Sequence, residues 1–307
     1  MVGFAFFDYR ILKNNSSVII ILYLLALFFL GVVIFLGKHI SGIKWLQLSS
    51  FGFDPLEFAK IVIVLLLAKY FSLRHIELYK KRHLIVSFIY VALPIFLVLL
   101  QPDLGSALIF IAAWLGLVLV SGIKLRHLVV IILLAAIIFG IMWLGFLKDY
   151  QKNRILTFLN PQKDPLGYSY NLRQSLIAIG SGKIFGKGFG KGLQSQLKFL
   201  PAGHTDFIFS VFAEERGFAG ILFLFLLYAV LIYRILAIGF AASDNFSKLF
   251  SMGFSIMIFA QILINIGMCL GLMPVIGIPL PFASYGGSSL LANFLGLGII
   301  QSIRVRN

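Results

Sequence analysis

Long, uninterrupted apolar segments dominate this chain and leave few folds open to it. About eight of them have close to the ~20 residues that a bilayer-spanning helix requires. They lie at roughly 17–37, 57–72, 83–100, 104–120, 127–147, 207–233, 249–272 and 287–303. Hydrophobic residues make up 60% of the chain and charged residues 12%, and a water-soluble domain cannot bury that much apolar surface. The sequence therefore predicts an all-α fold, a polytopic transmembrane bundle of about eight helices.

Lysine and arginine in the short connections indicate the orientation of these helices, because basic residues are retained on the cytoplasmic side. The short connections on one side carry Arg10, Lys13, Arg74, Lys80, Lys81, Arg82, Lys124, Arg126, Arg234, Lys248, Arg304 and Arg306. Those on the other side carry only Lys38 and Lys44. Both termini are therefore predicted to be cytoplasmic. Residues 148–205 are predicted to form a large external loop within a single membrane domain that covers 1–307.

The net charge of +15 and the single cysteine exclude several classes of function. The basic residues are scattered around a membrane domain, which favours contact with anionic lipid headgroups and gives no support to nucleic-acid binding. Cys269 has no second cysteine with which to form a disulfide or a cysteine-based metal site. No cofactor is evident, and a requirement for a divalent cation stays open.

The segment 201–209 carries the most pointed polar cluster, where the external loop meets a predicted helix. Thr205 can cap that helix, and Asp206 would then fall in its first turn, where the helix dipole favours a carboxylate. The alternative is that a partly desolvated Asp206 at the mouth of the membrane domain acts as a general base on a sugar hydroxyl. Composition alone does not separate the two interpretations.

Two more polar clusters lie at the predicted outer face. In the first, Asp103 follows Pro102 and either caps the next helix or lines a polar cavity. In the second, Glu57 and Lys60 stand at i, i+3, a spacing that favours an ion pair beside a cavity. Trp45, in the preceding connection, is typical of an interfacial aromatic anchor.

Three further segments have weaker signals. Glycine alternates with lysine in 177–192, which can approach phosphate groups but is more typical of a flexible loop. Glu214, Glu215 and Arg216 lie roughly 12–15 Å along the helix from Asp206, a depth that favours internal ion pairs over a proton pathway. Gly286 and Gly287 predict close helix packing.

Several of these segments, taken in order, resemble the RodA/FtsW (SEDS) family of peptidoglycan glycosyltransferases. The matching segments are EFAK at 57–60, QPDLG at 101–105, DPLG at 164–167, QSLIAIGSG at 174–182, HTDFIF at 204–209 and SYGGS at 284–288. Within the family, DYRIL at 8–12 and GLQSQL at 192–197 are more similar to the RodA branch, which serves cell elongation. The resemblance covers nearly the whole chain.

The resemblance implies polymerisation of lipid II outside the cytoplasmic membrane, beside a class B penicillin-binding protein that crosslinks the strands. It implies that Asp206 deprotonates the 4-hydroxyl of the acceptor sugar, with undecaprenyl pyrophosphate leaving the donor in a single inversion. The basic external loop would stabilise that anionic leaving group. The substrate-binding positions implied are Trp45, Glu57, Lys60, Gln101, Asp103, Arg154, Gln174, Ser175, His204 and Thr205.

Two departures from the family pattern and three rival functions accompany this interpretation. Ala202 stands where the family commonly has glutamate, and the chain begins at a motif that follows the second of the family's usual ten spans. We therefore expect either an N-terminally incomplete chain or a shortened lineage. The rivals are a flippase for lipid-linked cell-wall precursors, a secondary transporter and a noncatalytic scaffold for division or elongation. A transporter is disfavoured because no inverted repeat is visible.

Overall fold

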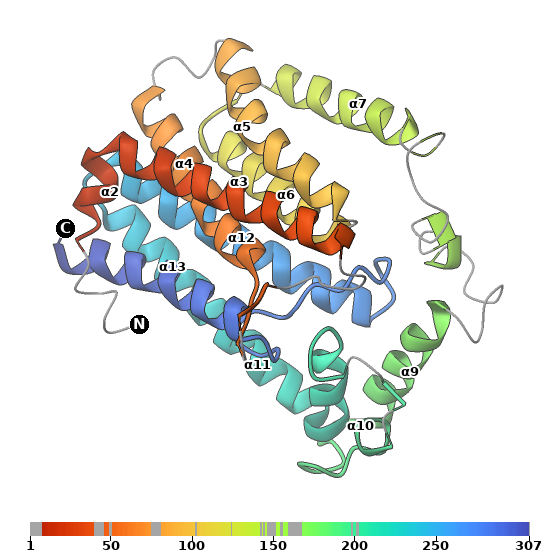
Figure 1. The fold of residues 1–307 in the computed structure, drawn as a ribbon. Helices are drawn as coiled ribbons and strands as arrows, with labels where there is room; N and C mark the ends of the chain where they lie inside the picture. Colours follow the sequence, from red (N-terminus) through yellow and green to blue (C-terminus); the bar gives the residue numbers. More distant parts are fainter. Residues whose placement is uncertain are drawn as a thin grey trace. The chain divides into compact units, whose positions relative to one another are not determined.

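The computed structural model describes most of the chain as helix (Figure 1). The described residues are 8–39, 46–48, 51–74, 81–101, 103–123, 125–141, 143, 145, 152–153, 156–158, 168–197, 199–200 and 203–306. The chain divides into two compact units. Unit 1 comprises Met1–Gly122, Ala229–Gln261 and Tyr285–Asn307, and unit 2 comprises Ile123–Tyr228 and Ile262–Ser284.

Each of the eight predicted spans coincides with a helix. These helices are α3 (Ser16–His39), α4 (Pro55–Arg74), α5 (Lys81–Leu100), α6 (Leu104–Val120), α7 (Leu125–Ile141), α11 (Ile208–Ala241), α12 (Asn245–Cys269) and α13 (Gly287–Arg306). Five helices of the described chain, α3, α5, α11, α12 and α13, are long and apolar enough to cross a membrane. Helices α6 and α7 are shorter, with 17 residues each, and α4 carries Glu57, Lys60, Lys69 and Arg74. The predicted polytopic helical fold is confirmed.

The remaining described elements are short. They are α2 (Arg10–Asn14), β1 (Leu46–Leu48), β2 (Phe51–Phe53), α9 (Tyr168–Ser181) and α10 (Leu193–Gln196). Strands β1 and β2 form an antiparallel hairpin, which the sequence analysis did not predict, with Leu46 opposite Phe53. Helices α9 and α10 lie within the predicted loop 148–205, so part of that loop is helical.

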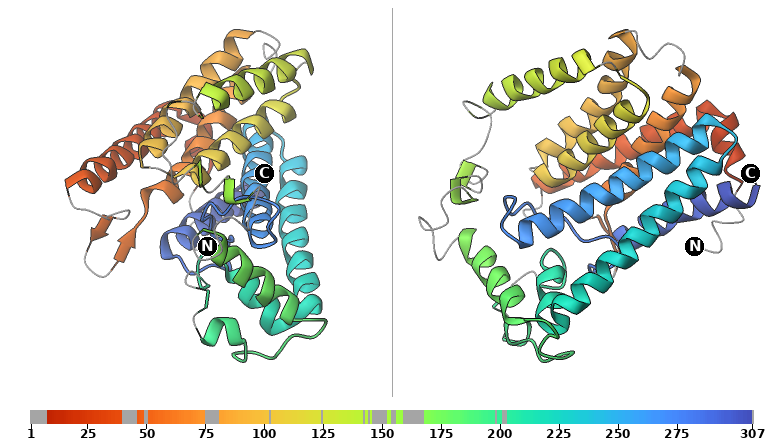
Figure 2. Two further views of the ribbon diagram at one scale, coloured as in Figure 1. Left: turned by 90° about the vertical axis from the view of Figure 1, so that its right-hand side faces the viewer. Right: turned by 180° about the vertical axis from the view of Figure 1, so that it is seen from behind.

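Helix α4 is the centre of unit 1. It packs against α3, α5, α6 and α13 (Figure 2). The side chains of Val64 and Leu67 have no exposed surface. A Cβ added to Gly253 of α12 would lie 2.9 Å from Val64 and 3.0 Å from Leu117. The absence of a side chain at Gly253 therefore lets α12 approach α4 and α6 closely.

Helix α11 is longer than a bilayer requires. Its 34 residues measure about 51 Å at 1.5 Å per residue, against roughly 30 Å of hydrocarbon. Its large exposed apolar side chains are Phe218, Leu222, Phe223, Phe225, Leu226, Leu227, Val230, Tyr233 and Phe240. This exposed apolar stretch measures about 33 Å. Glu214, Glu215 and Arg216 lie just before this exposed apolar stretch, and their depth in the membrane stays a prediction.

The predicted end of this helix, at residue 233, is wrong, because α11 continues past Arg234 to Ala241. The side chain of Arg234 is exposed. Arginine can bury its aliphatic part along an apolar surface while its guanidinium reaches the interface, so one arginine near the end of an apolar helix does not stop it.

The glycine-rich segment after α9 is folded against a break in α11, and the interpretation as flexible filler is wrong. Gly217 interrupts the helix with φ 66° and ψ −166°. Four backbone hydrogen bonds of 2.9–3.1 Å join Phe218 N to Lys183 O, Ala219 N to Ile184 O, Lys187 N to Glu214 O and Gly188 N to Glu215 O. At the break, main-chain N–H and C=O groups of α11 lose their hydrogen-bond partners within the helix. The glycine-rich segment supplies partners for them.

Two of the ionisable residues beside this break, Glu214 and Arg216, have partners. The Glu214 carboxylate, which has no exposed surface, accepts a hydrogen bond from Lys187 Nζ at 2.7 Å and others from Gln194 N at 3.2 and 3.3 Å. The Arg216 guanidinium lies 5.4 Å from the centre of the Phe189 ring. The predicted internal ion pairing is confirmed for Glu214.

Candidate active site

The turn 203–207 of unit 2 carries Asp206 immediately before α11. The helix begins at Ile208, so Asp206 lies two residues before it and not in its first turn. The predicted place of Asp206 in the first turn of the helix is therefore wrong, and a cap by Thr205 stays a prediction. His204 is exposed, and Thr205 and Asp206 are half-buried.

Side chains from outside the turn hold its main chain. Asn265 Nδ2 donates a hydrogen bond to the carbonyl oxygen of Asp206 at 2.8 Å, and Ser284 Oγ donates one to that of Thr205 at 2.6 Å. Cys269 Sγ, one helical turn after Asn265, lies 3.7 Å from the same Asp206 oxygen. These contacts engage the carbonyls of Thr205 and Asp206 before the helix begins.

A backbone without a side chain faces the Asp206 carboxylate. Gly277 has φ +81°, and a Cβ added to it would lie 3.1 Å from Asp206 Oδ2. Any L-residue at 277 would be strained in this conformation and would press on the carboxylate. The glycine therefore lets the backbone at 277 lie close to a half-buried carboxylate without a side chain against it.

Two of the predicted substrate-binding residues lie on α9. Ser175 has no exposed surface, and its hydroxyl lies 2.6 Å from Ser210 Oγ and 2.7 Å from the Cys269 carbonyl oxygen. These contacts tie α9 to the start of α11 and the end of α12. Gln174, the preceding residue, is half-buried.

Unit 1 contains the polar residues predicted around α4. Glu57 Oε1 and Lys60 Nζ are 2.7 Å apart, and both side chains are buried. Charges buried away from water are normally paired, because the loss of hydration costs several kcal/mol per ion. The ion pair that the i, i+3 spacing predicted is confirmed.

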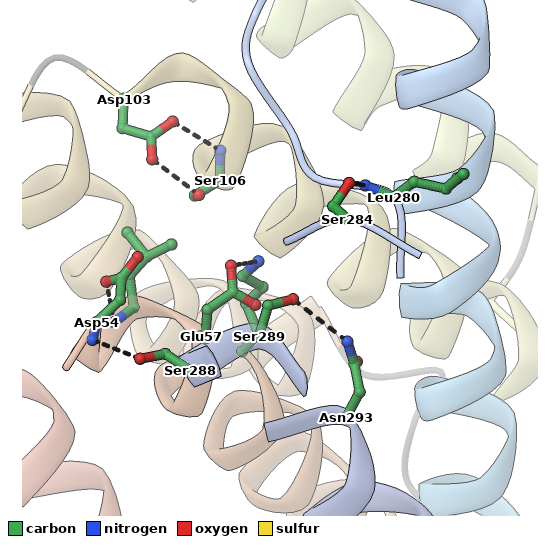
Figure 3. A network of polar contacts seen from close by, with 11 residues as sticks. Asp54, Glu57, Asp103, Ser106, Leu280, Ser284, Ser288, Ser289 and Asn293 are labelled. Atoms are coloured by element: carbon green, nitrogen blue, oxygen red, sulfur yellow. Dashed lines mark hydrogen bonds and ion pairs between the residues drawn. The ribbon is translucent and has the colours of Figure 1, made fainter. Parts of the chain in front are cut away.

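Asp54 adjoins this ion pair, and the sequence analysis did not single it out. Its Oδ1 accepts a hydrogen bond from Leu56 N at 3.0 Å, and its own N–H donates to Ser288 Oγ at 2.9 Å (Figure 3). Burial, and then the negative charge of Glu57, raise the pKa of Asp54 to about 6. The signal in the sequence was an aspartate directly before a proline, a frequent start of a helix.

Asp103 caps α6, as predicted. Its two carboxylate oxygens accept hydrogen bonds from Ser106 N at 3.1 Å and Ser106 Oγ at 2.9 Å (Figure 3). Gln101, just before it, donates from Nε2 to the Leu30 carbonyl at 3.0 Å. These two hydrogen bonds explain an aspartate at position 103 by its capping role alone, without a bound ligand.

The segment 284–288 contributes hydroxyl groups rather than close helix contacts. A Cβ on Gly286 would make only an ordinary contact of 3.6 Å, and one on Gly287 would meet nothing within 4 Å. The predicted close packing at these glycines is therefore wrong. Ser284 and Ser288 instead make the hydrogen bonds described above, which the sequence analysis missed.

Trp45 and Arg154 lie outside the described residues, as do Ala202 and the segment 164–167. Among the residues that the structure describes, no group of three or more His, Cys, Asp or Glu side chains is placed to hold a metal ion.

Comparison with known proteins gives the family. The pattern of the family described as cell cycle protein, which comprises FtsW, RodA and SpoVE, matches residues 1–307. The chain is 40% identical to the peptidoglycan glycosyltransferase MrdB of Escherichia coli K12 over 283 residues, which are 92% of this chain and 76% of MrdB.

Two solved structures are also similar. One is described as a peptidoglycan synthase complex that coordinates polymerization and crosslinking; it has a TM-score of 0.83 and 34% identity over 99% of this chain and 85% of its own. The other, the rod shape determining protein RodA of Thermus thermophilus, has a TM-score of 0.68 and 32% identity over 98% of this chain and 81% of its own. The chain therefore belongs to the FtsW/RodA/SpoVE family of cell cycle proteins.

Proposed function

We propose that this protein is a peptidoglycan glycosyltransferase that polymerises lipid II into glycan strands during cell elongation, with Asp206 as the general base. The enzyme class agrees with the name of its relative MrdB. The observation that carries the assignment of Asp206 is its setting: a half-buried carboxylate beside a side-chain-free backbone, on a turn held by Asn265 and Ser284.

In the reaction, Asp206 takes the proton of the acceptor 4-hydroxyl as that oxygen attacks the anomeric carbon of the donor. The new glycosidic bond forms while the bond to undecaprenyl pyrophosphate breaks, and a single inversion converts an α-linked donor into a β-1,4 product. General-base assistance of this kind contributes about 10²–10⁴-fold in rate. The leaving group departs as an anion, and the exposed Lys183 and Lys191 offer positive charge on the loop side.

The substrate-binding positions remain proposals of two kinds. Glu57, Lys60, Gln101 and Asp103 belong to unit 1, and Gln174, Ser175, His204 and Thr205 to unit 2. His204 and Gln174 retain exposed surface with which to contact a substrate. Ser175 has none, so its contribution would come from holding α9 against α11 and α12. Trp45 and Arg154 complete the set by resemblance.

The protein is a multi-pass membrane protein, and we propose that it lies in the bacterial inner membrane. The short-connection lysines and arginines support cytoplasmic termini and an external loop at 148–205 in a single membrane domain. The candidate active site would then face outward, where lipid II is consumed. A class B penicillin-binding protein is the proposed partner, supported by the likeness to a peptidoglycan synthase complex.

Incubation of the purified protein and its partner with fluorescent lipid II tests this function. We expect ladders of glycan strands on a gel, abolished by digestion with a muramidase. If the folded complex made no strands but moved lipid II across vesicle bilayers, the protein would be a flippase. If it did neither, while cells still required it for assembly of the partner, it would be a scaffold.

A further inference from the structure

We infer that Asn265 and Ser284 are positioning residues, which fix the carboxylate of Asp206 by holding two consecutive peptide carbonyls. The inference rests on the proposed function, in which Asp206 is the base. Both residues are buried, with Asn265 at 0% and Ser284 at 5% exposure, so they act through the main chain and not on the substrate.

Asn265 uses both hydrogens of one amide nitrogen. Its Nδ2 donates to the carbonyl of Asp206 at 2.8 Å and to the carbonyl of Ile278 at 2.7 Å. A protonated aspartate of the same shape could donate only one such bond, an ionised aspartate none, and leucine none. Position 265 therefore requires an amide. Aspartate and leucine, which are close to asparagine in size, can test this requirement.

The Asn265 amide holds both the residue that carries the carboxylate and the backbone that faces it. One bond fixes the residue that carries the carboxylate, and the other fixes Ile278, the neighbour of Gly277, whose backbone faces Asp206 Oδ2. Loss of this amide would leave the carboxylate and its opposing backbone free to move independently. The separation between them is thus set by one side chain.

Ser284 forms a second, separate connection. Its Oγ accepts a hydrogen bond from Leu280 N at 2.7 Å (Figure 3) and donates one to the carbonyl of Thr205 at 2.6 Å. The loop that contains Leu280 is itself held by Tyr228, whose hydroxyl donates to the carbonyl of Pro281 at 2.6 Å. The carbonyls of 205 and 206 belong to the peptide groups on either side of the Asp206 Cα. Because both are held, the direction in which the Asp206 side chain leaves the backbone is fixed.

The test measures kcat and KM for lipid II in the purified complex with its partner, for Asn265→Asp, Asn265→Leu and Ser284→Ala. A displacement of the base by about 1 Å can cost on the order of 10²-fold in rate. We expect kcat to fall roughly 10- to 100-fold in each variant, with KM unchanged within about 2-fold, because a loss confined to the transition state lowers kcat alone.

A matched control separates this effect from loss of stability. Ser87, fully buried in unit 1, also donates to a carbonyl, that of Leu84 at 2.9 Å, and accepts an N–H, that of Trp114 at 3.0 Å. Ser87→Ala removes the same kind of hydrogen-bonding group as Ser284→Ala. We expect it to lower the melting temperature and to leave kcat unchanged.

The decisive arm repeats the substitutions in an Asp206→Asn background. If Asn265 and Ser284 act through the Asp206 carboxylate, they should not reduce the residual rate further. The inference is overturned if folded Ser284→Ala and Asn265→Asp keep normal kcat, or if their losses multiply in that background. Full activity of Asp206→Asn alone would instead overturn the proposed function, whatever the other variants do.

Discussion

Buried carboxylates in this protein are stabilised in different ways, and the difference predicts how each responds to pH. Glu57 and Glu214 each lie 2.7 Å from a lysine ammonium group. The Asp54 carboxylate accepts one backbone hydrogen bond, from Leu56 N, but the negative charge of Glu57 lies close by. Burial and that charge raise the pKa of Asp54 to about 6, so its ionised form is disfavoured in the folded protein.

Asp54→Asn should change how stability depends on pH. Because the folded pKa lies above that of the unfolded chain, the folded state binds the additional proton, and stability is lost as pH rises from about 4 to about 6. Asparagine retains the helix cap without the charge. We expect the variant to be more stable than the wild type at pH 7, by on the order of 2 kcal/mol, and equal to it near pH 4.

Thermal unfolding of both proteins in detergent between pH 4 and 7.5 checks this expectation. If the difference in melting temperature between wild type and Asp54→Asn stayed constant over this pH range, Asp54 would ionise without cost in the folded state.

The residues predicted correctly from the sequence are those whose partners are close in the chain. Glu57 pairs with Lys60 three residues later, and Asp103 caps a helix through Ser106. Asn265 and Ser284 bind carbonyls 59 and 79 residues away, so no local spacing indicates them. For Asn265 one signal was present: an amide within an apolar run usually has a defined partner.

At the scale of elements, the break in α11 is the feature with the most consequences. Gly217 adopts a backbone conformation that is essentially restricted to glycine. A Cβ at this position would lie 2.3 Å from Gly186 N and 2.6 Å from Ile184 O. The break and the glycine-rich segment therefore depend on each other.

Gly217→Ala should destabilise the protein by at least about 2 kcal/mol, since backbone strain of this kind costs roughly 1–3 kcal/mol before the steric clash is added. Gly180→Ala is the matched control, because it lies in α9 with nothing within 4 Å of an added Cβ. We expect Gly180→Ala to be neutral or to stabilise by up to about 1 kcal/mol. Equal melting temperatures for the two variants would contradict the description of the break.

Helix positions followed from the sequence, whereas helix ends and loop structure did not. An apolar run predicts that a span exists, since its backbone groups must be satisfied internally. It does not predict that α11 continues past Arg234, nor that the helix is interrupted at Gly217. Residues 182–192 are held by contacts with α11, and the composition of the loop gives no indication of those contacts.

At the scale of the whole molecule, the orientation in the membrane decides where the chemistry occurs. We expect a cysteine at Lys191, on the exposed glycine-rich segment, to react with a membrane-impermeant maleimide in intact spheroplasts. A cysteine at Val305, in the exposed last turn of α13, should react only after permeabilisation. The native Cys269 is fully buried and should give little background. The reverse labelling pattern would place the Asp206 turn in the cytoplasm and exclude the proposed external reaction.

On the proposed function, the activity of the enzyme depends most directly on Asp206. Asparagine keeps the shape of the side chain but cannot take a proton, so Asp206→Asn isolates basicity from structure. Asp244→Asn is a suitable control, because Asp244 caps α12 through Ser247 and lies 3.5 Å from Lys13, within unit 1. Ordinary losses of a cap cost only about 1 kcal/mol.

The measurement is the rate of lipid II polymerisation by the purified complex of each variant with its partner, at equal amounts of folded protein. The account predicts a loss of about 10²–10⁴-fold for Asp206→Asn and a rate close to that of the wild type for Asp244→Asn. A near-normal rate for folded Asp206→Asn would contradict it, and the base would then have to be sought at Asp103 or Glu57.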